Sequence, residues 1–347
     1  ALLSVLEKHA APNKKLIVIP CSDYYAGMLS RHYDRFKGLI ANRFIPSSLL
    51  GTLDTKDKFY ELCEQHGLDY PTTVVCEPHE RESVLERMEF RFPIVVKPEN
   101  SNAYDYLHCR FEGKKKVFFF DNREDYLTMI RSMNTSDYRG KLIIQEFIPG
   151  GDNAMRVINS FSDNNGKVKL MCLGQPVLEE YAPATLGNYA AIISRSDEAL
   201  YAKIQAFLEQ IGYVGFSNID MKFDSRTGKY MMFEINPRLG RSSLFVRAAG
   251  LNMIKALIDQ VVYGKEEACV YGQATALWTN VPKSVLQRYV TDPTLSAEIA
   301  GLYRQNKVIR SIWYSKDLNF KRILSNLRYS YSHINNFRRY YFDKGQA

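Results

Sequence analysis

Apolar residues near the start of the chain form short runs that alternate with amphipathic helical patterns. Residues 15–20 (KLIVIP) are a continuous apolar run, as expected for a strand buried on both faces, and a helical pattern follows from Asp23. A second apolar stretch at 39–45 precedes a helix that we expect over residues 52–67, where a glycine ends it. The pattern predicts an α/β domain over residues 1–70.

Residues 71–150 change to short strands and helices around one long polar segment. We expect strands at 72–76, 92–98, 116–120 and 141–149, helices at 79–89 and 122–133, and a polar loop at 99–115. This order predicts a small α+β unit.

Residues 151–263 have the pattern of a mostly antiparallel sheet with helices packed on it. We expect strands at 154–162, 167–173 and 188–194, a long hairpin at 214–236, and helices at 197–211 and 243–262. Residues 264–347 then form a separate C-terminal extension. The whole chain is therefore predicted to combine α/β and α+β units.

The composition is that of a folded protein with an excess of basic residues. Of 347 residues, 46% are apolar and 24% are charged, which excludes disordered and low-complexity proteins. The 46 Lys and Arg against 38 Asp and Glu give a net charge of +8, which favours anionic partners. The six cysteines are far apart, and no stretch has the about 18 consecutive apolar residues of a membrane helix. We therefore expect a cytoplasmic protein with reduced thiols and no transmembrane segment.

The basic charge is concentrated in the C-terminal extension. Residues 264–347 hold 13 Lys and Arg against 6 Asp and Glu. Within residues 328–347, six aromatic residues alternate with four cations, a pattern that fits contact with nucleic acid or an anionic membrane. The same pattern fits a terminal helix that packs its aromatic residues on the protein and leaves its cations in water.

The hairpin at 214–236 carries three oxygen-bearing side chains in an apolar setting. Glu234 and Asn236 share a face because strand side chains alternate, and Asp220 can reach that face from the opposite strand. Hard divalent cations prefer oxygen ligands, so these three residues are candidates for a magnesium site. The alternative is that Asp220 and Glu234 are ordinary solvent-facing strand residues.

Two lysines and one irregular segment are the other candidates. Lys97 ends the buried strand FPIVVKP and Lys56 opens the helix after residue 52, and a lysine point charge suits phosphate oxygens. Taken singly, each could be a surface lysine. The segment QEFIPGGD at 145–152 leaves irregular backbone after a strand, which can pair with a purine edge, and Asp152 could accept from ribose hydroxyls. By itself this segment is only a turn.

The order of these pieces resembles the ATP-grasp superfamily over roughly residues 15–263, by these element boundaries. The motifs are D-T-K before a helix, F-P-I-V-V-K-P, Q-E-F-I-P-G, and an aspartate followed by E-I-N-P-R. The resemblance implies an ATP-grasp fold with nucleotide between two α+β subdomains: a lid subdomain at 71–150 and a metal-binding subdomain at 151–263. It implies that phosphates are held by Lys56 and Lys97, adenine by Gln145, Glu146, Phe147 and Ile148, ribose by Asp152, Mg²⁺ (or Mn²⁺) by Asp220, Glu234 and Asn236, and the acyl phosphate by Arg238.

Within the superfamily the chain is most similar to the D-aspartate ligases of peptidoglycan cross-bridge synthesis. The similarity rests on IPCSDYYAGML at 19–29, DKFYELCEQHGLDYP at 57–71, and KVKLMCLGQPVLEEYAPATLGNYAAI at 167–192. The lid segment 99–115 departs from the superfamily because it lacks the usual glycines. Members normally begin with a further strand, so residues 1–70 are expected to be part of a larger Rossmann-like domain.

The resemblance implies amide formation through an acyl phosphate. A carboxylate attacks the γ-phosphate of ATP, and an amine then displaces phosphate, while Lys97, Arg238 and Arg241 neutralise the developing charge. The polar segment 99–115 would close over the phosphates and exclude water. The implied partners are a small amino-acid carboxylate, with donor contacts near Asn188 and Tyr189, and an anionic amine-bearing precursor. The competing hypotheses are another amino-acid ligase, a silent nucleotide-binding relative, and, less favoured, a nucleic-acid-binding protein.

Overall fold

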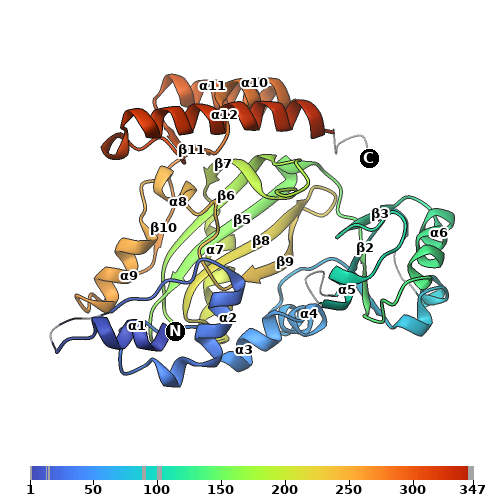
Figure 1. Cartoon of the computed structure of the whole chain (residues 1–347), viewed down its shortest axis with the longest axis horizontal. Coiled ribbons are helices and arrows are strands. Elements are labelled where there is room, and N and C mark those ends of the chain that lie inside the picture. Colours follow the sequence, from blue (N-terminus) through green and yellow to red (C-terminus); the bar gives the residue numbers. More distant parts are fainter. Residues whose placement is uncertain (1, 13, 15, 88–90, 100–103, 343–347) are drawn as a thin grey trace. The chain divides into compact units, whose positions relative to one another are not determined.

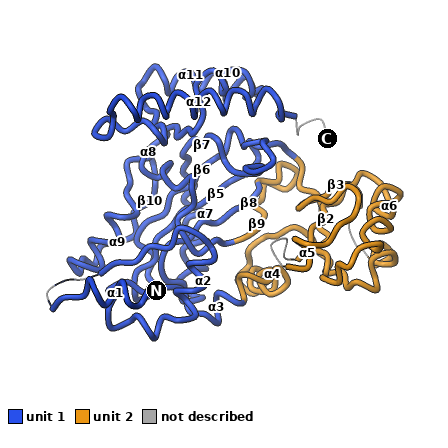
Figure 2. Tube along the Cα trace, viewed as in Figure 1, with its two compact units in different colours: residues 1–51, 150–222, 235–347 blue, residues 52–149, 223–234 orange. Residues whose placement is uncertain are grey.

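The computed structural model describes residues 2–12, 14, 16–87, 91–99 and 104–342 (Figure 1). The chain divides into two compact units, shown in different colours in Figure 2. Unit 1 comprises residues 1–51, 150–222 and 235–347, and unit 2 comprises residues 52–149 and 223–234. The outer half of one long hairpin, residues 223–234, therefore belongs to unit 2 while its base belongs to unit 1.

Unit 2 is built on a four-stranded antiparallel sheet in the order β1-β4-β2-β3. The strands are β1 (Thr73–Cys76), β2 (Ile94–Pro98), β3 (Phe118–Phe120) and β4 (Leu142–Glu146). Its helices are α4 (Lys56–Gln65), α5 (Tyr104–His108) and α6 (Arg123–Asn134), with short 3₁₀ turns at Pro78–Glu80 and Val84–Arg87. The four predicted strands of this region are confirmed.

The two faces of this sheet differ. One face packs on a buried core that includes Ile94, Val96 and Ile144, together with aromatic residues of β3 and α6. The alternate residues must point to the other face, because successive strand side chains alternate. Directly paired residues of neighbouring strands place Phe119, Val95, Gln145 and Thr73 in one row across that second face.

Unit 1 contains the base of an eight-stranded, mostly antiparallel sheet. Seven strands follow the order β12-β11-β7-β6-β5-β8-β9, and β10 pairs with β6. The strands are β5 (Met155–Ser162), β6 (Val168–Glu179), β7 (Tyr189–Arg195), β8 (Gly215–Asp224), β9 (Lys229–Asn236), β10 (Val270–Tyr271), β11 (Leu277–Thr279) and β12 (Val308–Arg310). The predicted strands and the hairpin are confirmed.

Helices of unit 1 come from all three of its segments. They are α1 (Leu2–His9), α2 (Asp23–Arg31), α3 (Ser47–Leu53), α7 (Glu198–Gln210), α8 (Phe245–Ala248), α9 (Met253–Val261), α10 (Lys283–Tyr289), α11 (Pro293–Arg304) and α12 (Phe320–Tyr340). Short 3₁₀ turns lie at Tyr33–Arg35, Asp152–Ala154 and Ser315–Asp317. The last three helices lie side by side in Figure 1 and share a core with β7 and β11, which includes Leu286, Ile299 and Phe337.

Side-chain caps fix where several of these helices begin. Asn122, Asp197, Asn252 and Asn319 each stand just before a helix and accept a hydrogen bond from a backbone N–H of its first turn. Such a cap satisfies an N–H that has no partner inside the helix and contributes about 1 kcal/mol. The predicted starts near residues 122 and 197 follow from this chemistry.

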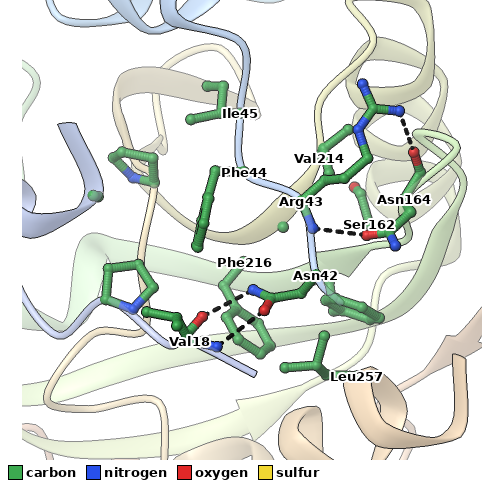
Figure 3. A pocket seen from close by; sticks show the side chains of 15 residues that line it. Val18, Asn42, Arg43, Phe44, Ile45, Ser162, Asn164, Val214, Phe216 and Leu257 are labelled. Carbon is green, nitrogen blue, oxygen red and sulfur yellow. Dashed lines mark hydrogen bonds between the residues drawn. The ribbon is translucent and has the colours of Figure 1, made fainter. Parts of the chain in front are cut away.

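The predicted strand at 15–20 is wrong in this form. Lys15 lies outside the described residues, and over residues 16–20 the structure has no strand, only a bridge between Leu16 and Ile40. The side chain of Asn42 takes the place of a partner strand, because its amide donates to the Val18 carbonyl (2.8 Å) and accepts from the Val18 N–H (3.0 Å). Figure 3 shows this pairing at the edge of a small cavity.

That cavity has a volume of about 20 Å³, and it is lined by residues of the first segment of unit 1 and by residues of the unit 1 sheet. Arg43 bonds Asn164 through both its backbone N–H and its guanidinium, each at 2.9 Å (Figure 3). Among the described residues, the buried Ser162 hydroxyl on the cavity wall has no hydrogen-bond partner. A space of this size holds about one water molecule, so the cavity suits a structural water and is too small for a nucleotide.

Two predicted helices are also corrected. The helix expected at 79–89 is a pair of short 3₁₀ turns over its described residues, because Arg81 is buried and its guanidinium bonds Asn134 and the Gly140 carbonyl. The helix expected at 243–262 is broken into α8 and α9. Gly250 ends the first piece with a left-handed φ of 86°, which favours glycine.

All six cysteines are free thiols. Cys21 is exposed, whereas the other five are buried or partly buried. Burial raises the pKa of the Cys63, Cys172 and Cys269 thiols to about 12 and that of Cys76 to about 11. These four thiols are therefore protonated and poorly reactive at neutral pH.

Candidate active site

Two lysines and a carboxylate meet in unit 2. Lys56 begins α4 and its ammonium donates to the Phe233 carbonyl (2.7 Å) and contacts the Glu234 carboxylate (3.2 Å). Lys97 is the fourth residue of β2, and the charges of both Lys56 and Glu234 act on it. Three of the predicted site residues therefore lie close together: Lys56 at the start of α4, Lys97 near the end of β2, and Glu234 on β9.

Lys97 is held in an unfavourable environment for a cation. Burial, followed by repulsion from Lys56, lowers the pKa of Lys97 to about 7, and Glu234 offsets only part of this shift. Removing a cation from water favours its neutral form unless an anion is nearby. Two lysines beside a single carboxylate therefore make a site that a polyanion such as a triphosphate would fit, because it supplies the missing negative charge.

Gln145 lies on the second face of the unit 2 sheet, in the row with Val95 and Phe119, and is itself buried. Its amide nitrogen donates to the Tyr60 hydroxyl (2.7 Å) and to the Thr73 hydroxyl (2.9 Å), so both of its N–H groups bind within the unit. Phe119 is 64% exposed in this row, and its ring meets Phe147 edge to face at 6.1 Å between centroids. Phe119 thus presents an exposed aromatic ring on this face, while contact of Gln145 with adenine stays a prediction.

The segment after Gln145 is held by contacts within unit 2. Glu146 accepts a hydrogen bond from the Arg226 guanidinium (2.7 Å), which also pairs with the buried Asp224. The Phe147 N–H donates to the Pro93 carbonyl (3.4 Å), and the Ile148 side chain is buried. These contacts fix the backbone that was predicted to face the purine edge.

A chain of polar contacts runs through the expected metal and substrate residues of unit 1. Asp220 on β8 accepts from the Tyr189 hydroxyl (2.7 Å) and from the Asn236 amide (3.1 Å). The Asn236 oxygen accepts from Arg238 (3.3 Å), and the Arg238 guanidinium forms a two-point ion pair with Asp23 at 2.6 and 3.0 Å. The arginine of N-P-R is therefore oriented by the first residue of α2.

A second chain links Arg241 to the C-terminal helix. Arg241 pairs with the buried Glu180 carboxylate (2.7 Å), which also accepts from the Asn280 amide (3.3 Å). Asn280 donates in turn to the Tyr329 hydroxyl on α12 (2.8 Å). His333, one turn further along α12, is buried, and its pKa is lowered by burial, with Glu180 opposing and Arg241 adding to the shift.

Asp152 is tied to the end of β6. Its carboxylate accepts from the Glu179 N–H (2.8 Å) and from the Tyr181 hydroxyl (2.9 Å). This arrangement fixes the turn after Gly151 and keeps one carboxylate in place. A role toward ribose stays a prediction.

The expected metal ligands fall in two units. Glu234 belongs to unit 2, whereas Asp220 and Asn236 belong to unit 1, so their convergence on one ion stays a prediction. Over the described part of the chain, no group of three or more His, Cys, Asp or Glu side chains forms a metal cluster. The expected set contains two carboxylates and one amide, a donor set that suits Mg²⁺ when substrate phosphates complete its coordination.

Several contact residues escaped the sequence argument. Asp23, Glu180, Asn280 and Tyr329 were not singled out, and each lies far along the chain from the residue it contacts. Tyr189, expected near the donor contacts, lies on β7 between β11 and β6 and bonds Asp220 of the hairpin. Residues 100–103 of the predicted lid segment lie outside the described residues, and its described part is not a plain loop, since it contains α5.

Comparisons with known proteins bear on the family and the fold of the chain. The family model of the carbamoyl-phosphate synthase L chain ATP-binding domain matches residues 177–265, which include the hairpin and N-P-R. The D-aspartate ligase of Enterococcus faecium (strain Aus0004) is 36% identical over 349 residues, covering 97% of this chain and 82% of that protein.

Solved structures share the fold at low sequence identity. The biotin carboxylase domain of Hydrogenobacter thermophilus 2-oxoglutarate carboxylase, in complex with MgADP, ADP and bicarbonate, matches with a TM-score of 0.56 and 14% identity, over 78% of this chain and 57% of that one. An ADP complex of N5-carboxyaminoimidazole ribonucleotide synthetase matches with a TM-score of 0.55 and 13% identity, over 88% and 71% of the two chains. The chain thus spans little more than half the length of the carboxylase structure, and these matches bear on the fold alone.

Proposed function

Because the chain belongs to the D-aspartate ligase family of the ATP-grasp superfamily, we propose that it joins the β-carboxylate of D-aspartate to a lysine side-chain amine of a peptidoglycan precursor. The protein is an ATP-dependent carboxylate–amine ligase that forms an amide bond with release of ADP and phosphate. The observation that carries the site assignment is the grouping of Lys56, Lys97 and Glu234 in unit 2.

Residues of unit 2 bind the phosphates and the adenine ring of the nucleotide. Lys56 and Lys97 hold its phosphates, which gives the buried Lys97 ammonium the anionic partner that its depressed pKa indicates it needs. The adenine ring lies on the row of Phe119, Val95 and Gln145, with the backbone of Phe147 beside it. Glu146 and Ile148 hold that backbone in place, and Asp152 accepts from the ribose.

Magnesium is the proposed metal, and manganese is an acceptable substitute because both prefer oxygen ligands. Glu234, Asp220 and Asn236 would hold it. When bound, the metal neutralises charge on the transferred phosphate. The Tyr189 hydroxyl orients the Asp220 carboxylate, and the Arg238 guanidinium orients the Asn236 amide oxygen.

The two arginines act on the donor and on the reacting carboxylate. A carboxylate becomes electrophilic once it carries the phosphoryl group, and its oxygens then develop negative charge as the amine attacks. Arg238, aligned by Asp23, faces that charge, and Arg241, aligned by Glu180, binds the second carboxylate of aspartate. A dicarboxylic donor needs a cation that ATP does not use, and Arg241 supplies it.

The remaining partners follow from charge and compartment. None of the helices that the structure describes is long and apolar enough to cross a membrane. We place the enzyme in the cytoplasm, where thiols stay reduced and ATP is supplied. The acceptor is an anionic precursor bearing the amine, and the basic C-terminal extension contacts an anionic membrane surface.

Phosphate release with D-Asp, L-Asp, D-Ala and Gly, with a lysine-containing muropeptide as acceptor, tests the proposal. We expect D-Asp to be turned over fastest, with a product heavier by one aspartyl residue in mass spectrometry. A preference for D-Ala or Gly would overturn the donor assignment and leave the ligase intact. No ADP release with any donor would overturn the proposed catalytic site.

A further inference from the structure

The C-terminal helix α12 has two distinct faces. It is 21 residues long, and Asn326, His333 and Phe337 are its buried residues. They are separated by seven and four positions, so they form one line along a helix of 3.6 residues per turn. Through this line α12 packs on the body of unit 1, beside α10 and α11 (Figure 1).

A second line of apolar side chains runs along the exposed side of α12. Phe320, Leu324, Leu327 and Tyr331 are spaced by four, three and four positions, and they are 82%, 42%, 53% and 64% exposed. This spacing places them on one stripe, which we call the outer stripe. A continuous apolar stripe in water is uncommon on a monomeric protein surface and marks a site of contact.

The charge on α12 is entirely positive. The helix contains five Lys and Arg and no Asp or Glu. Lys321, Arg328 and Arg339 are separated by seven and eleven positions, so they form a basic row beside the outer stripe. Arg322 lies on another face, where it pairs with Asp317 (2.7 Å). Within the described residues no carboxylate forms an ion pair with the three members of the basic row.

We propose that α12 lies in the interface of an anionic lipid bilayer. The outer stripe inserts among the acyl chains near the headgroups, and the basic row contacts the headgroup phosphates. A long helix with one apolar and one basic face, and too polar to span a bilayer, has the features of such an interfacial helix. The orientation leaves the opposite line, with His333 and Phe337, packed on the protein.

Charge and polarity favour this occupant over the two others that could cover the stripe. The anionic amine-bearing precursor matches the basic row, but it offers no apolar surface for four large side chains. A second copy of the chain could cover the stripe with its own α12. The two helices would then face each other with five cations each and no acidic residue on either, so their charges would repel. An anionic bilayer supplies both the apolar layer and the negative charge.

This inference deepens the surface contact of the proposed function and rests on it for its biological purpose. Its measurement is separate, because vesicle binding is followed without ATP, donor or acceptor. Ligase turnover is then assayed without vesicles. Loss of one property with retention of the other therefore shows which of the two proposals has failed.

The test is co-sedimentation of the full chain with vesicles of phosphatidylcholine alone or mixed with phosphatidylglycerol, at low and high salt. We expect binding to the mixed vesicles, little binding to phosphatidylcholine alone, and weakening by salt. The variant Leu324→Gln/Leu327→Gln should lower the partition coefficient at least tenfold. The variant Lys321→Gln/Arg328→Gln/Arg339→Gln should lower it on the order of 100-fold, at about 1 kcal/mol per cation.

Tyr263→Gln is the matched control, because Tyr263 is 68% exposed and lies outside α12. It should bind vesicles as the unchanged protein does, and all three variants should keep their circular dichroism and their turnover without vesicles. Equal binding to both vesicle types would overturn the proposal, as would unchanged binding of the two α12 variants. A dimer in light scattering that Leu324→Gln/Leu327→Gln makes monomeric would assign the stripe to a second copy instead.

Discussion

Replacing Lys97 by methionine should remove activity and raise stability. Methionine keeps most of the length of the side chain and takes away the charge that β2 holds in a buried place. In the proposed site the phosphates then lose one of two lysines, so ADP release should fall by at least about 100-fold, as for other groups that stabilise developing charge. The folded protein, in contrast, loses an unfavourable group.

The magnitude follows from the pKa of Lys97, which burial and the nearby Lys56 lower from 10.5 to about 7. At 1.36 kcal/mol per unit, the folded state disfavours the cation by roughly 4 to 5 kcal/mol. Because the unfolded chain binds more protons than the folded one between pH 7 and 10.5, this destabilisation is full below pH 7 and is relieved as pH rises. Lys97→Met should therefore be more stable at pH 7, with a smaller difference at pH 9.

Urea unfolding of both proteins at pH 7 and pH 9, with and without MgATP, measures this difference. Lys58→Met is the control, since Lys58 is exposed on the same helix as Lys56 and should change neither stability nor turnover by much. MgATP should stabilise the unchanged protein and the control more than Lys97→Met. A Lys97→Met protein that is less stable at pH 7 and still releases ADP normally would refute the reasoning.

Three further predictions concern the other polar residues. Glu234→Gln and Asn236→Ala should each fold and lose at least about 100-fold of MgATP-dependent turnover, because each changes a proposed metal ligand; near-normal rates in both would contradict the proposed metal site. Arg241→Ala should lower kcat/KM for aspartate by an amount that corresponds to about 2 to 5 kcal/mol of activation free energy, and should affect glycine far less; equal losses for both donors would contradict a contact with the second carboxylate. Burial lowers the pKa of His333, so its stabilising neutral form is fully present above pH 6.5 and is lost as pH falls below that value. His333→Phe should therefore show a smaller loss of stability between pH 7 and pH 5 in urea unfolding, and an unchanged acid slope would show that another group titrates.

Local patterns predicted most elements because they depend on nearby residues. The hairpin strands, the buried strand before Lys97 and the helix starts at Asn122 and Asp197 follow from alternation and capping within a few positions. The break at Gly250 had a local signal as well, a glycine followed two positions later by the cap residue Asn252. The helix was nevertheless predicted as unbroken because the apolar pattern continues on both sides of Gly250.

Long-range pairing was beyond the sequence argument. Alternation shows which residues share a face, but it does not show that β7 lies inside the sheet or that Asn42 replaces a strand beside Val18. The ion pair of Asp23 with Arg238 joins positions 215 residues apart, and no spacing rule connects them. Lys56 and Lys97 could be singled out because a charged residue in an apolar strand and the order of motifs can both be read from the sequence alone.

The exposure of Cys21 has a practical consequence. A maleimide dye should react at Cys21 first, because the four thiols with raised pKa values are both shielded and protonated. The label would then sit two residues from Asp23, whose carboxylate aligns Arg238. The sequence thus already provides a position for a fluorescent label close to the Asp23–Arg238 ion pair of the proposed site.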